Sequence, residues 1–553
     1  MLRKSFVLFT VLILFSLITA PTAAVQASTA ASTSNYEPDN TAGQAKLITS
    51  GTPQTKSIVP KTDLDWVKFQ LTTTSGVLFE TSGPFESDTR ISLYDSTLTP
   101  IEFHDDKPGS FWSYIDRACG TDPLPPGTYY VKVEEYLNDA QIPSYHLAFD
   151  ASPCPAEVMN IYAGANRLGS SLLAPHTSIR RSIPGVNSGP VRVVNTGSTP
   201  MMVSERSLYK VNGVYTSFAE MMALPNSQVD LTYWLPWYNN VDLDTQLRIA
   251  NVGTTTATVQ VFIGGVQMPG SPFNLAAGAS TRRSFAGINS GPLRISSSQP
   301  IVAAERVIYK VKGVETSFSE MMALPAAHLD TTYWLPWYNN VDLDTQLRIA
   351  NISGTPATVH VYIGGVEMQG SPFNLAAGAS TRKSFVGINN GPVQIVSDQL
   401  IVAAERVIYK VQGLQTSFTE MMALPNNQLS KTYWMPWYNN SGDLDTQLRI
   451  ANVSGSPATV HIYIGGAEMT GSPFPLAVGT STRKSFAGIN SGPVQIVSDQ
   501  NIVAAERFIY TVKGVQTSFA EMMGLPEHHL GITQWLPWYN SVGLDTQLRI
   551  GLP

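Results

Sequence analysis

The chain has few charged residues, few cysteines and, beyond its N-terminus, no long apolar run. Only 14% of its 553 residues are charged, and the formal net charge at pH 7 is −6. Nucleic-acid binding depends on clusters of Lys and Arg that neutralise phosphates, and the sequence has no such cluster. A membrane-spanning helix needs ~20 predominantly apolar residues, which no internal segment supplies. We therefore expect neither a nucleic-acid partner nor a membrane span.

The N-terminus has the pattern of a secretory signal peptide. Arg3 and Lys4 precede the apolar run 6–18, and Val25-Gln26-Ala27 is a cleavage site of small residues. We predict a signal peptide at residues 1–27 and a Ser/Thr/Ala-rich spacer at 28–34. The protein is then expected to be secreted, and to be extracellular or held at the cell surface.

The two cysteines of the chain are Cys119 and Cys154. An even pair in an exported protein most simply forms one disulfide, and closing this loop stabilises a fold by roughly 3–4 kcal/mol in the chain-entropy model. Two free buried thiols are the alternative. The remainder of the chain contains no cysteine and has to be held together by packing.

Short alternating segments separated by Gly, Pro and Asp fill residues 35–152. Segments 65–71, 89–94, 128–133 and 144–149 each alternate apolar with polar residues. Short strands at this spacing are typical of an antiparallel β-sandwich. The pattern predicts a β-sandwich domain at 35–152.

A series of motifs in this region resembles the bacterial pre-peptidase C-terminal (PPC) domain. The motifs follow in order as Glu37-Pro38-Asp39-Asn40, Asp63-Leu64-Asp65-Trp66, Leu93-Tyr94-Asp95, Asp105-Asp106 and the segment 124–133. The resemblance implies a jelly-roll-like sandwich of the kind attached to secreted peptidases and other exported proteins. It is confined to residues 35–152.

The same resemblance implies a possible calcium site. Related collagen-binding segments of collagenases bind calcium through acidic residues, and the matching positions are Glu37, Asp39, Asn40, Asp63 and Asp65. Calcium takes six to eight oxygen ligands in irregular geometry, which such a set can offer. The alternative is that Asp39 and Asn40 make turn hydrogen bonds while the other carboxylates are solvated. No other cofactor is expected.

The rest of the chain repeats with a period of about 100 residues, a length at which a unit can bury its own core. The segment 233–240, Tyr-Trp-Leu-Pro-Trp-Tyr-Asn-Asn, returns with small changes at 333–340, 433–440 and 534–541. Solenoid repeats are much shorter, because each is a single supersecondary piece. We predict four modules, at 155–253, 254–353, 354–454 and 455–553.

Within each repeat the pattern is mostly that of strands. In the third copy 446–451 and 458–464 alternate, Gly465-Gly466 is a hairpin signal, and 502–510 is the longest apolar run. Serine followed three residues later by glutamate, as in Ser217 and Glu220, is a helix capping box, and a proline ends the segment. The fold class is therefore all-β: an N-terminal jelly-roll-like β-sandwich followed by four tandem β-sandwich, immunoglobulin-like modules, each with one short helical turn.

The array begins and stops at the same internal point of the repeat. The first copy opens in the strand around 161–164, and the last copy stops in 546–550, the strand that precedes this one in complete copies. This point is either a simple domain boundary or the place where the final strands close back onto the first unit, which would hide sheet edges. An artificially shortened chain is a third reading. We expect the simple boundary.

The aromatic segment of each repeat is the most attractive candidate for ligand binding. Residues on one strand face would fill the core, while the other face would present rings that stack on sugars or on partner side chains. The alternative is that both faces are buried, one in the core and one against a neighbouring module. The candidates are Trp234, Trp237, Tyr238, Trp334, Trp337, Tyr338, Trp434, Trp437, Tyr438, Trp535, Trp538 and Tyr539.

A Glu-Arg dipeptide, Glu405-Arg406 in the third module, recurs in every copy. The two side chains of adjacent strand residues point to opposite faces, so they cannot pair with each other. Arg449 or Asp445 is a suitable partner for Glu405, and a buried structural ion pair explains the motif better than catalysis does. No nucleophile–base set and no metal-protease or phosphate-binding motif is present.

We therefore expect a non-enzymatic secreted protein that binds extracellular polysaccharide or a surface protein, in adhesion or as a surface scaffold. Four linked weak sites would raise avidity for a repetitive ligand. One alternative is a non-catalytic targeting region or subunit of a secreted peptidase. The other is a purely structural component of the cell surface.

Overall fold

The computed structural model describes residues 34–83, 87–107, 110–119, 122–211, 214–311, 314–411, 414–442, 444–512 and 515–553. The predicted signal peptide and the spacer up to residue 33 lie outside the described residues. The described chain is all-β, as the sequence predicts, and its only helical elements are five short 3-10 turns. None of the described helices is long and apolar enough to cross a membrane.

The first module is a sandwich of two antiparallel sheets with one parallel edge pair. Its strands are β1 (Lys46–Leu47), β2 (Gln54–Ile58), β3 (Asp65–Leu71), β4 (Ser75–Ser82), β5 (Thr89–Tyr94), β6 (Pro100–His104), β7 (Tyr114–Arg117), β8 (Gly127–Glu135) and β9 (Ile142–Pro153), after the turn η1 (Ala42–Gln44). One sheet has the order β1-β3-β8-β5-β6 and the other β2-β9-β4-β7. Phe69, Phe79 and Phe149 pack against one another in the core between them, with the Phe79 and Phe149 rings stacked. The predicted disulfide, Cys119–Cys154, is present beside this core.

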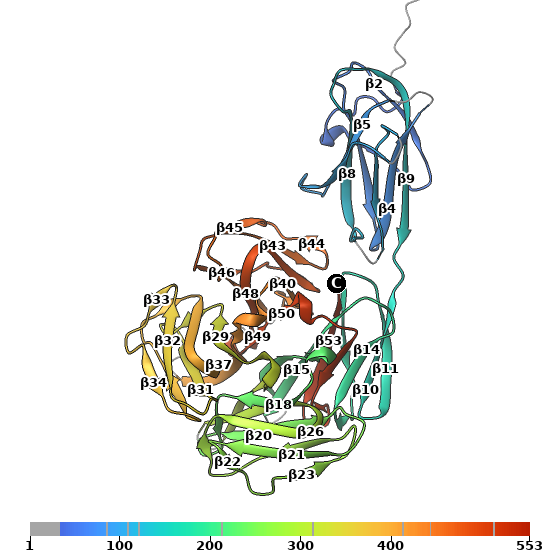
Figure 1. Cartoon of the computed structure of the whole chain (residues 1–553). Coiled ribbons are helices and arrows are strands. Elements are labelled where there is room, and N and C mark those ends of the chain that lie inside the picture. The colour runs from blue at the N-terminus through green and yellow to red at the C-terminus, as the bar shows by residue number, and fades with distance from the viewer. Residues whose placement is uncertain are drawn as a thin grey trace, which may run out of the picture.

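The repeats form four units, A to D, arranged as a closed ring (Figure 1). Unit B is typical. It contains β18 (Asp230–Leu235), β19 (Tyr238–Asn239), β20 (Asp244–Asn251), β21 (Ala257–Ile263), β22 (Val266–Gln267), β23 (Phe273–Leu275), β24 (Ser280–Arg283), β25 (Asn289–Ser290), β26 (Leu293–Val311), β27 (Val314–Met322) and β28 (Leu324–Pro325). The long strand β26 joins the two layers, because its first half lies between β21 and β18 and its second half between β20 and β27.

Units C and D repeat this arrangement strand by strand. Unit C contains β29 (Asp330–Leu335), β30 (Tyr338–Asn339), β31 (Asp344–Asn351), β32 (Ala357–Ile363), β33 (Val366–Glu367), β34 (Phe373–Leu375), β35 (Ser380–Lys383), β36 (Asn389–Asn390), β37 (Val393–Val411), β38 (Leu414–Met422) and β39 (Leu424–Pro425). Unit D contains β40 (Ser430–Met435), β41 (Tyr438–Asn439), β42 (Leu444–Asn452), β43 (Ala458–Ile464), β44 (Ala467–Glu468), β45 (Phe474–Leu476), β46 (Ser481–Lys484), β47 (Asn490–Ser491), β48 (Val494–Val512), β49 (Val515–Met523) and β50 (Leu525–Pro526). The predicted hairpin at Gly465-Gly466 is confirmed between β43 and β44, and both glycines have positive φ, 60° and 77°.

Unit A is assembled from both ends of the repeat region. It contains β10 (Glu157–Ala163), β11 (Asn166–Leu173), β12 (Thr177–Ser182), β13 (Asn187–Ser188), β14 (Val191–Asn195), β15 (Met202–Val211), β16 (Val214–Met222) and β17 (Leu224–Pro225) together with β51 (Thr533–Leu536), β52 (Tyr539–Asn540) and β53 (Asp545–Leu552). Strand β53 lies between β12 and β15, and β51 lies between β14 and β17. The expected simple boundary is therefore wrong. The final strands are paired on both sides by the first unit, which removes the open edges that a linear array would leave.

Each unit has an apolar core between its layers, and neighbouring units contribute to it. The core of unit B holds Tyr233, Leu247 and Ile295, and it also contains Leu224 from unit A and Ala404 from unit C. Unit D similarly takes in Trp334 and Leu424 of unit C. The units are therefore sandwiches that depend on their neighbours for part of their packing.

Four strands, one from each unit, surround the axis of the ring. They are β16, β27, β38 and β49, and their serine hydroxyls form a closed circle of hydrogen bonds. The oxygen–oxygen distances are 3.0 Å for Ser217–Ser317, 3.2 Å for Ser317–Ser417, 3.0 Å for Ser417–Ser518 and 3.3 Å for Ser518–Ser217. This circle places an approximate fourfold axis at the centre of the molecule.

The capping-box prediction is wrong for these segments, because they are strands. Ser217 bonds around the axis, and Glu220 lies opposite Arg206 on the neighbouring strand, where their side chains pair. The short helical turn of each unit lies after the proline instead, at η2 (Asn226–Gln228), η3 (Ala326–His328), η4 (Asn426–Gln428) and η5 (Glu527–His529). The box is a local pattern, and pairing with a partner strand overrides it.

Candidate functional site

Each seam between two units contains buried charged residues from the Glu-Arg motif. At the seam between units B and C, Arg406 Nε donates to Glu420 Oε1 at 2.7 Å within unit C. Glu305 of unit B faces this pair and Arg348, and its own side chain is almost fully buried. Burial and the charge of Glu420 raise the pKa of Glu305 well above its usual value, although both arginines oppose the shift.

The predicted structural role of the motif agrees with this geometry. Burial raises the pKa of Glu405, and the charges of Arg507 and of Arg449, one of the two partners expected for Glu405, oppose this rise. Both arginines belong to the next unit around the ring, so this charge interaction crosses the seam. The Arg of each dipeptide pairs instead with the glutamate of its own inner hairpin, as Arg406 does with Glu420.

A tryptophan and an arginine stack across every seam. The Arg348 guanidinium of unit C lies 4.8 Å from the ring centroid of Trp237 in unit B, and the same contact recurs in the other three seams. The indole Nε1 of Trp237 donates to Asn289 Oδ1 at 2.8 Å. A guanidinium over an indole contributes ~0.5–2 kcal/mol, depending on its desolvation. These stacks therefore help to hold the ring closed.

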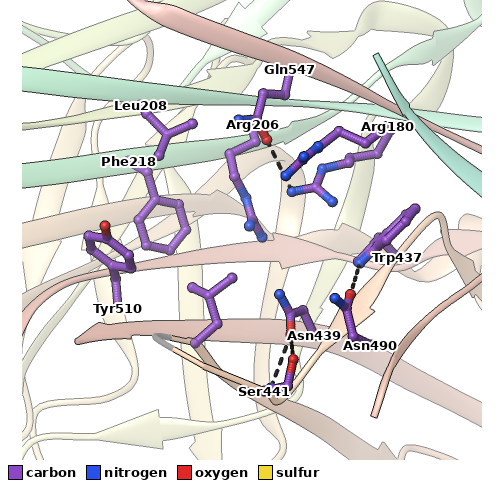
Figure 2. A pocket seen from close by; sticks show the side chains of 12 residues that line it. Arg180, Arg206, Leu208, Phe218, Trp437, Asn439, Ser441, Asn490, Tyr510 and Gln547 are labelled. Atoms are coloured by element: carbon purple, nitrogen blue, oxygen red, sulfur yellow. Dashed lines mark hydrogen bonds between the residues drawn. The ribbon is translucent and has the colours of Figure 1, made fainter. Parts of the chain in front are cut away.

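At the seam between units D and A, the arginines and the tryptophan of this arrangement line an open cavity of about 550 Å³. Figure 2 shows its side chains converging from the two units. Unit A supplies Arg180, Arg206, Leu208, Phe218, Gln547 and Arg549, and unit D supplies Trp437, Asn439, Ser441, Leu444, Asn490 and Tyr510. We call this cavity the D/A pocket. The corresponding space at the B/C seam, lined by Leu243, Tyr309, Arg406, Ile408, Ser417 and Phe418, is about 30 Å³.

The arginines of the D/A pocket differ in their environments. Arg206 is buried and paired with Glu220. Arg549 is also buried, and burial together with the charge of Arg206 lowers its pKa to about 9. Its Nη2 donates to Gln547 Oε1 at 3.2 Å, whereas its Nε has no hydrogen-bond partner among the described residues. Arg180 is exposed at the edge of the pocket.

Two asparagines of unit D are oriented by hydrogen bonds from the protein. Asn490 Oδ1 accepts from Trp437 Nε1 at 2.8 Å, and Asn439 Oδ1 accepts from the backbone N–H of Ser441 at 3.0 Å. These bonds fix which end of each side chain is the amino group. The two amino groups and the guanidinium groups of the arginines are the hydrogen-bond donors of the pocket wall.

The predicted aromatic platform is not found in the structure, and its residues divide into three groups. Tyr238, Tyr338, Tyr438 and Tyr539 are at most 1% exposed and donate to backbone carbonyls. Trp334 and Trp434 are buried, and Trp234 and Trp535 pack against the core of the adjacent unit. Trp237, Trp337, Trp437 and Trp538 are half-buried at the seams. The twelve residues do not form one exposed platform, because the tyrosines lie in the unit cores and Trp234, Trp334, Trp434 and Trp535 pack against neighbouring units. Ligand binding by the half-buried seam tryptophans stays a prediction, and of these Trp437 lines the D/A pocket.

Three of the five predicted calcium ligands lie close together. Carboxylate oxygens of Glu37, Asp39 and Asp65 lie within 4.8 Å of one another. Asn40 Oδ1 accepts from the backbone N–H of Leu64 at 3.2 Å, and Asp63 accepts from nearby backbone N–H groups.

The buried ammonium group of Lys56 lies within this acidic cluster. It bonds to Asp39 and is 3.4 Å from Asp65, whose pKa burial raises to about 7. One oxygen of Glu37 and one of Asp39 have no hydrogen-bond partner among the described residues. The carboxylates thus fit a cation chemically, but in this arrangement the Lys56 ammonium supplies the positive charge. Calcium binding stays a prediction.

The pocket residues that the sequence does not single out include Arg180, Asn439, Asn490 and Gln547. Their signal was the period of the repeat, since Arg282, Arg382 and Arg483 occupy the position of Arg180. Nothing in one copy shows that these residues meet a neighbouring copy. That contact arises only from the ring.

The comparisons with known proteins give weak similarities. No family model and no curated protein matches the chain. The PPC domain of collagenase from Bacillus anthracis is 15% identical over 19% of this chain and 94% of that chain, with a TM-score of 0.17. The BSP domain of a biofilm-associated protein is 8% identical over 87% of this chain and 98% of that chain, with a TM-score of 0.14.

A third similar structure contains the M60 catalytic domain with the CBM51-1 and CBM51-2 domains of Clostridium perfringens ZmpB. It is 9% identical over 88% of this chain and 55% of that chain, with a TM-score of 0.13. Similarities of this size carry no functional conclusion. The function is therefore argued from the geometry of the site.

Proposed function

We propose that the protein is a secreted, non-enzymatic binding protein that acts outside the cell, and that the D/A pocket is its ligand site. The observation that carries the proposal is the pocket itself, a cavity of about 550 Å³ with guanidinium, amide and indole groups in its wall. Binding sites for small ligands and sugar units fall in the range of about 300–1,000 Å³.

The chemistry of the lining supports binding rather than catalysis. Its described residues include no carboxylate, imidazole or thiol. A general acid or base must reach the reacting group within hydrogen-bond distance. Glu220 and Glu506 lie near the pocket, but the first is paired with Arg206 and the second is fully buried.

The ligand class that best fits this lining is an extracellular polysaccharide. Amides and guanidinium groups bond hydroxyl and carboxylate oxygens, and Trp437, Leu444 and Tyr510 supply an apolar wall. A protein ligand at the cell surface is the second candidate. In either case the closed ring holds the two halves of the pocket, from units D and A, side by side.

Retention on insoluble polysaccharides tests this proposal. We expect the chain without residues 1–27 to be retained, and Trp437→Ala to reduce retention. Trp337→Ala is the matched control, because it removes the equivalent indole–guanidinium stack from another seam. Equal retention of the two variants, both shown to be folded by circular dichroism, would remove the D/A pocket from the proposal. The same preparation should release no peptides from casein, and hydrolysis would overturn the non-enzymatic assignment.

A further inference from the structure

A small cavity lies on the axis of the ring, where the inner strands of all four units end. We call it the axial cavity. Its volume is about 140 Å³, and equivalent residues of every unit line it, among them Leu224, Leu324, Leu424 and Leu525. Sites for drug-sized ligands and sugars are larger, at about 300–1,000 Å³. The axial cavity therefore fits an ion or a very small molecule, and it shares no lining residue with the D/A pocket.

Four methionines line the axial cavity. Each is the last residue of an inner strand and is half-buried, and they are Met222, Met322, Met422 and Met523. A thioether is uncharged and polarisable, and soft metal ions bind it. The described lining residues include no carboxylate and no thiol, which are the ligands of calcium sites and of most structural zinc sites.

Two histidines from opposite units meet at this cavity. At one position of the short helical turn, units A to D have Gln228, His328, Gln428 and His529, and all four side chains line the cavity. The ring centroids of His328 and His529 are 5.7 Å apart. An imidazole nitrogen binds a metal such as zinc at about 2.0–2.1 Å. Two rings at this separation can therefore reach one common ion.

Hydrogen bonds fix the tautomer of a neutral His529 ring. Asn427 Nδ2 donates to the carbonyl oxygen of Leu329 at 3.4 Å, so Asn427 Oδ1 accepts from Gln428 Nε2, at 2.9 Å. The remaining Gln428 oxygen then accepts from Nε2–H of His529. The lone pair of the ring is therefore on Nδ1. Metal-binding histidines are oriented in this way, by donating their other ring N–H to an oxygen of the protein.

Gln228, the counterpart of these histidines in unit A, is left without a partner. It is 8% exposed, and its Nε2 has no hydrogen-bond partner among the described residues. Buried polar side chains in folded proteins almost always have one. The nitrogen makes no bond that would resist half a turn of the amide, which exchanges its nitrogen and oxygen. An ion in the axial cavity would give this amide the partner that it lacks.

We infer that the axial cavity binds one soft monovalent metal ion, copper(I). His328 and His529 supply imidazole nitrogens, and the methionines supply thioether sulfurs. Imidazole and thioether ligands both suit copper, and thioethers favour its copper(I) state. A divalent ion is less suitable, because burying its larger charge costs more and no anionic side chain of the wall offsets it. This site is separate from the D/A pocket and does not depend on the proposed function.

Titration of the chain without residues 1–27 with silver(I) and copper(I) tests the inference. Silver nitrate in chloride-free buffer is the probe that needs no reductant, and ascorbate keeps copper as copper(I). No free cysteine is present among the described residues to bind these ions instead. We expect one ion per chain and a melting temperature that rises with its concentration, because the folded state binds the ion. Zinc should bind at least about tenfold more weakly than silver, and equally tight zinc binding would overturn the assignment.

Histidine variants locate the ion with little risk to the fold. His328→Gln and His529→Gln give units B and D the residue that units A and C already have. Each should weaken silver binding at least about tenfold. His360→Gln is the control, because His360 does not line the axial cavity, and it should change the affinity less than about twofold. Unchanged affinity in both axial variants would overturn the inference.

The methionines are tested separately. The X-ray absorption spectrum of the copper(I) complex should show sulfur as well as nitrogen neighbours of the metal. Met322→Leu combined with Met523→Leu conserves volume and should weaken silver binding about tenfold. Met368→Leu, at a buried methionine outside the cavity, should leave the affinity unchanged. A spectrum without sulfur neighbours, or an unchanged affinity of the double variant, would show that the thioethers are not ligands and would overturn the inference.

Discussion

At the scale of single residues, the seams combine buried carboxylates with buried guanidinium groups. Glu506 is fully buried, and neither of its oxygens has a hydrogen-bond partner among the described residues. Burial raises its pKa well above the usual value, Glu220 adds to the rise, and Arg206 and Arg549 oppose it. The folded state therefore holds this proton more tightly than the unfolded chain does.

This raised pKa predicts how Glu506→Gln changes stability with pH. A carboxyl group with a raised folded pKa adds no penalty below its unfolded pKa, and it destabilises the fold as the pH rises toward the folded value. The free energy of unfolding of Glu506→Gln should therefore increase relative to that of the unaltered protein as the pH rises from about 5 to about 8. Denaturant titrations at the two pH values measure the difference.

The exposed Glu527 provides the control for this experiment. Glu527→Gln should leave the pH dependence of stability unchanged, because its side chain is solvated in both states. A Glu506→Gln variant that loses stability relative to the unaltered protein as the pH rises would contradict the predicted sign. That result would mean that the ionised carboxylate strengthens the seam.

Lys56 is the second residue with a testable role. It is the buried cation of the acidic cluster, bonded to Asp39 and close to Asp65. Removing one partner of a buried ion pair costs about 3–5 kcal/mol, because the remaining charge is left uncompensated. We expect Lys56→Met to lower the melting temperature of the first module in EDTA, and calcium to restore part of the loss.

Scanning calorimetry with EDTA or with calcium measures this effect. Lys68→Met, on the exposed face of β3, is the control and should respond to neither condition. If calcium stabilises the unaltered protein as much as the variant, Lys56 does not compete with the ion. The five predicted ligands would then bind calcium with the lysine in place.

The aromatic and pocket residues show which site features the sequence could reveal. Trp437 was found because tryptophan is rare and recurs at a fixed period. Arg180 was missed because one exposed arginine in a short strand has no distinguishing pattern. Its significance depends on Arg549 and Trp437, which reach the same pocket only after the ring has closed.

At the scale of elements, local patterns predicted the strands well where partners are near in sequence. The Gly465-Gly466 hairpin is confirmed because the turn and both strands lie within one short segment. The segment from Ser217 to Glu220 was predicted as a helical turn, and it is part of β16. Its strand state depends on β15 and on three other units around the axis, none of which a local pattern includes.

The turn before each long strand provides a prediction at this scale. A Cβ on Gly391 would lie 2.5 Å from the carbonyl oxygen of Pro336 and 2.7 Å from Ser481 Oγ of the next unit. The first contact is with backbone, which cannot rotate away. Gly391→Ala should therefore destabilise the protein by about 1–3 kcal/mol, as overpacking does in a close-packed interior.

Gly354→Ala is the matched control for Gly391→Ala. A Cβ at position 354 meets nothing within 4 Å. Replacing glycine in such open space leaves stability unchanged or raises it by less than about 1 kcal/mol, because the unfolded chain loses freedom. Equal midpoints of the two variants in urea unfolding would show that the seam at Gly391 is looser than its contacts indicate.

At the scale of the whole molecule, the main difference between expectation and structure is the closure of the ring. The sequence already showed that the array starts and stops at the same internal point. It could not show whether those ends meet, because β53 has the same pattern as β20, β31 and β42, which pair within their own units. Closure is a long-range contact between residues separated by more than 300 positions, as Ser207 and Thr546 are.

Deletion of residues 533–553 tests the closure directly. Without β51 and β53, unit A loses the strands between β14 and β17 and between β12 and β15, and it exposes their unpaired edges. Exposed edges of this kind pair with other chains. We expect the truncated protein to melt at a lower temperature and to self-associate in light scattering. Deletion of residues 1–154, which removes both cysteines, should leave a monomer with the melting transition of the ring, because β53 closes unit A without the first module. A chain that lacks residues 533–553 and still is a stable monomer would show that closure is dispensable.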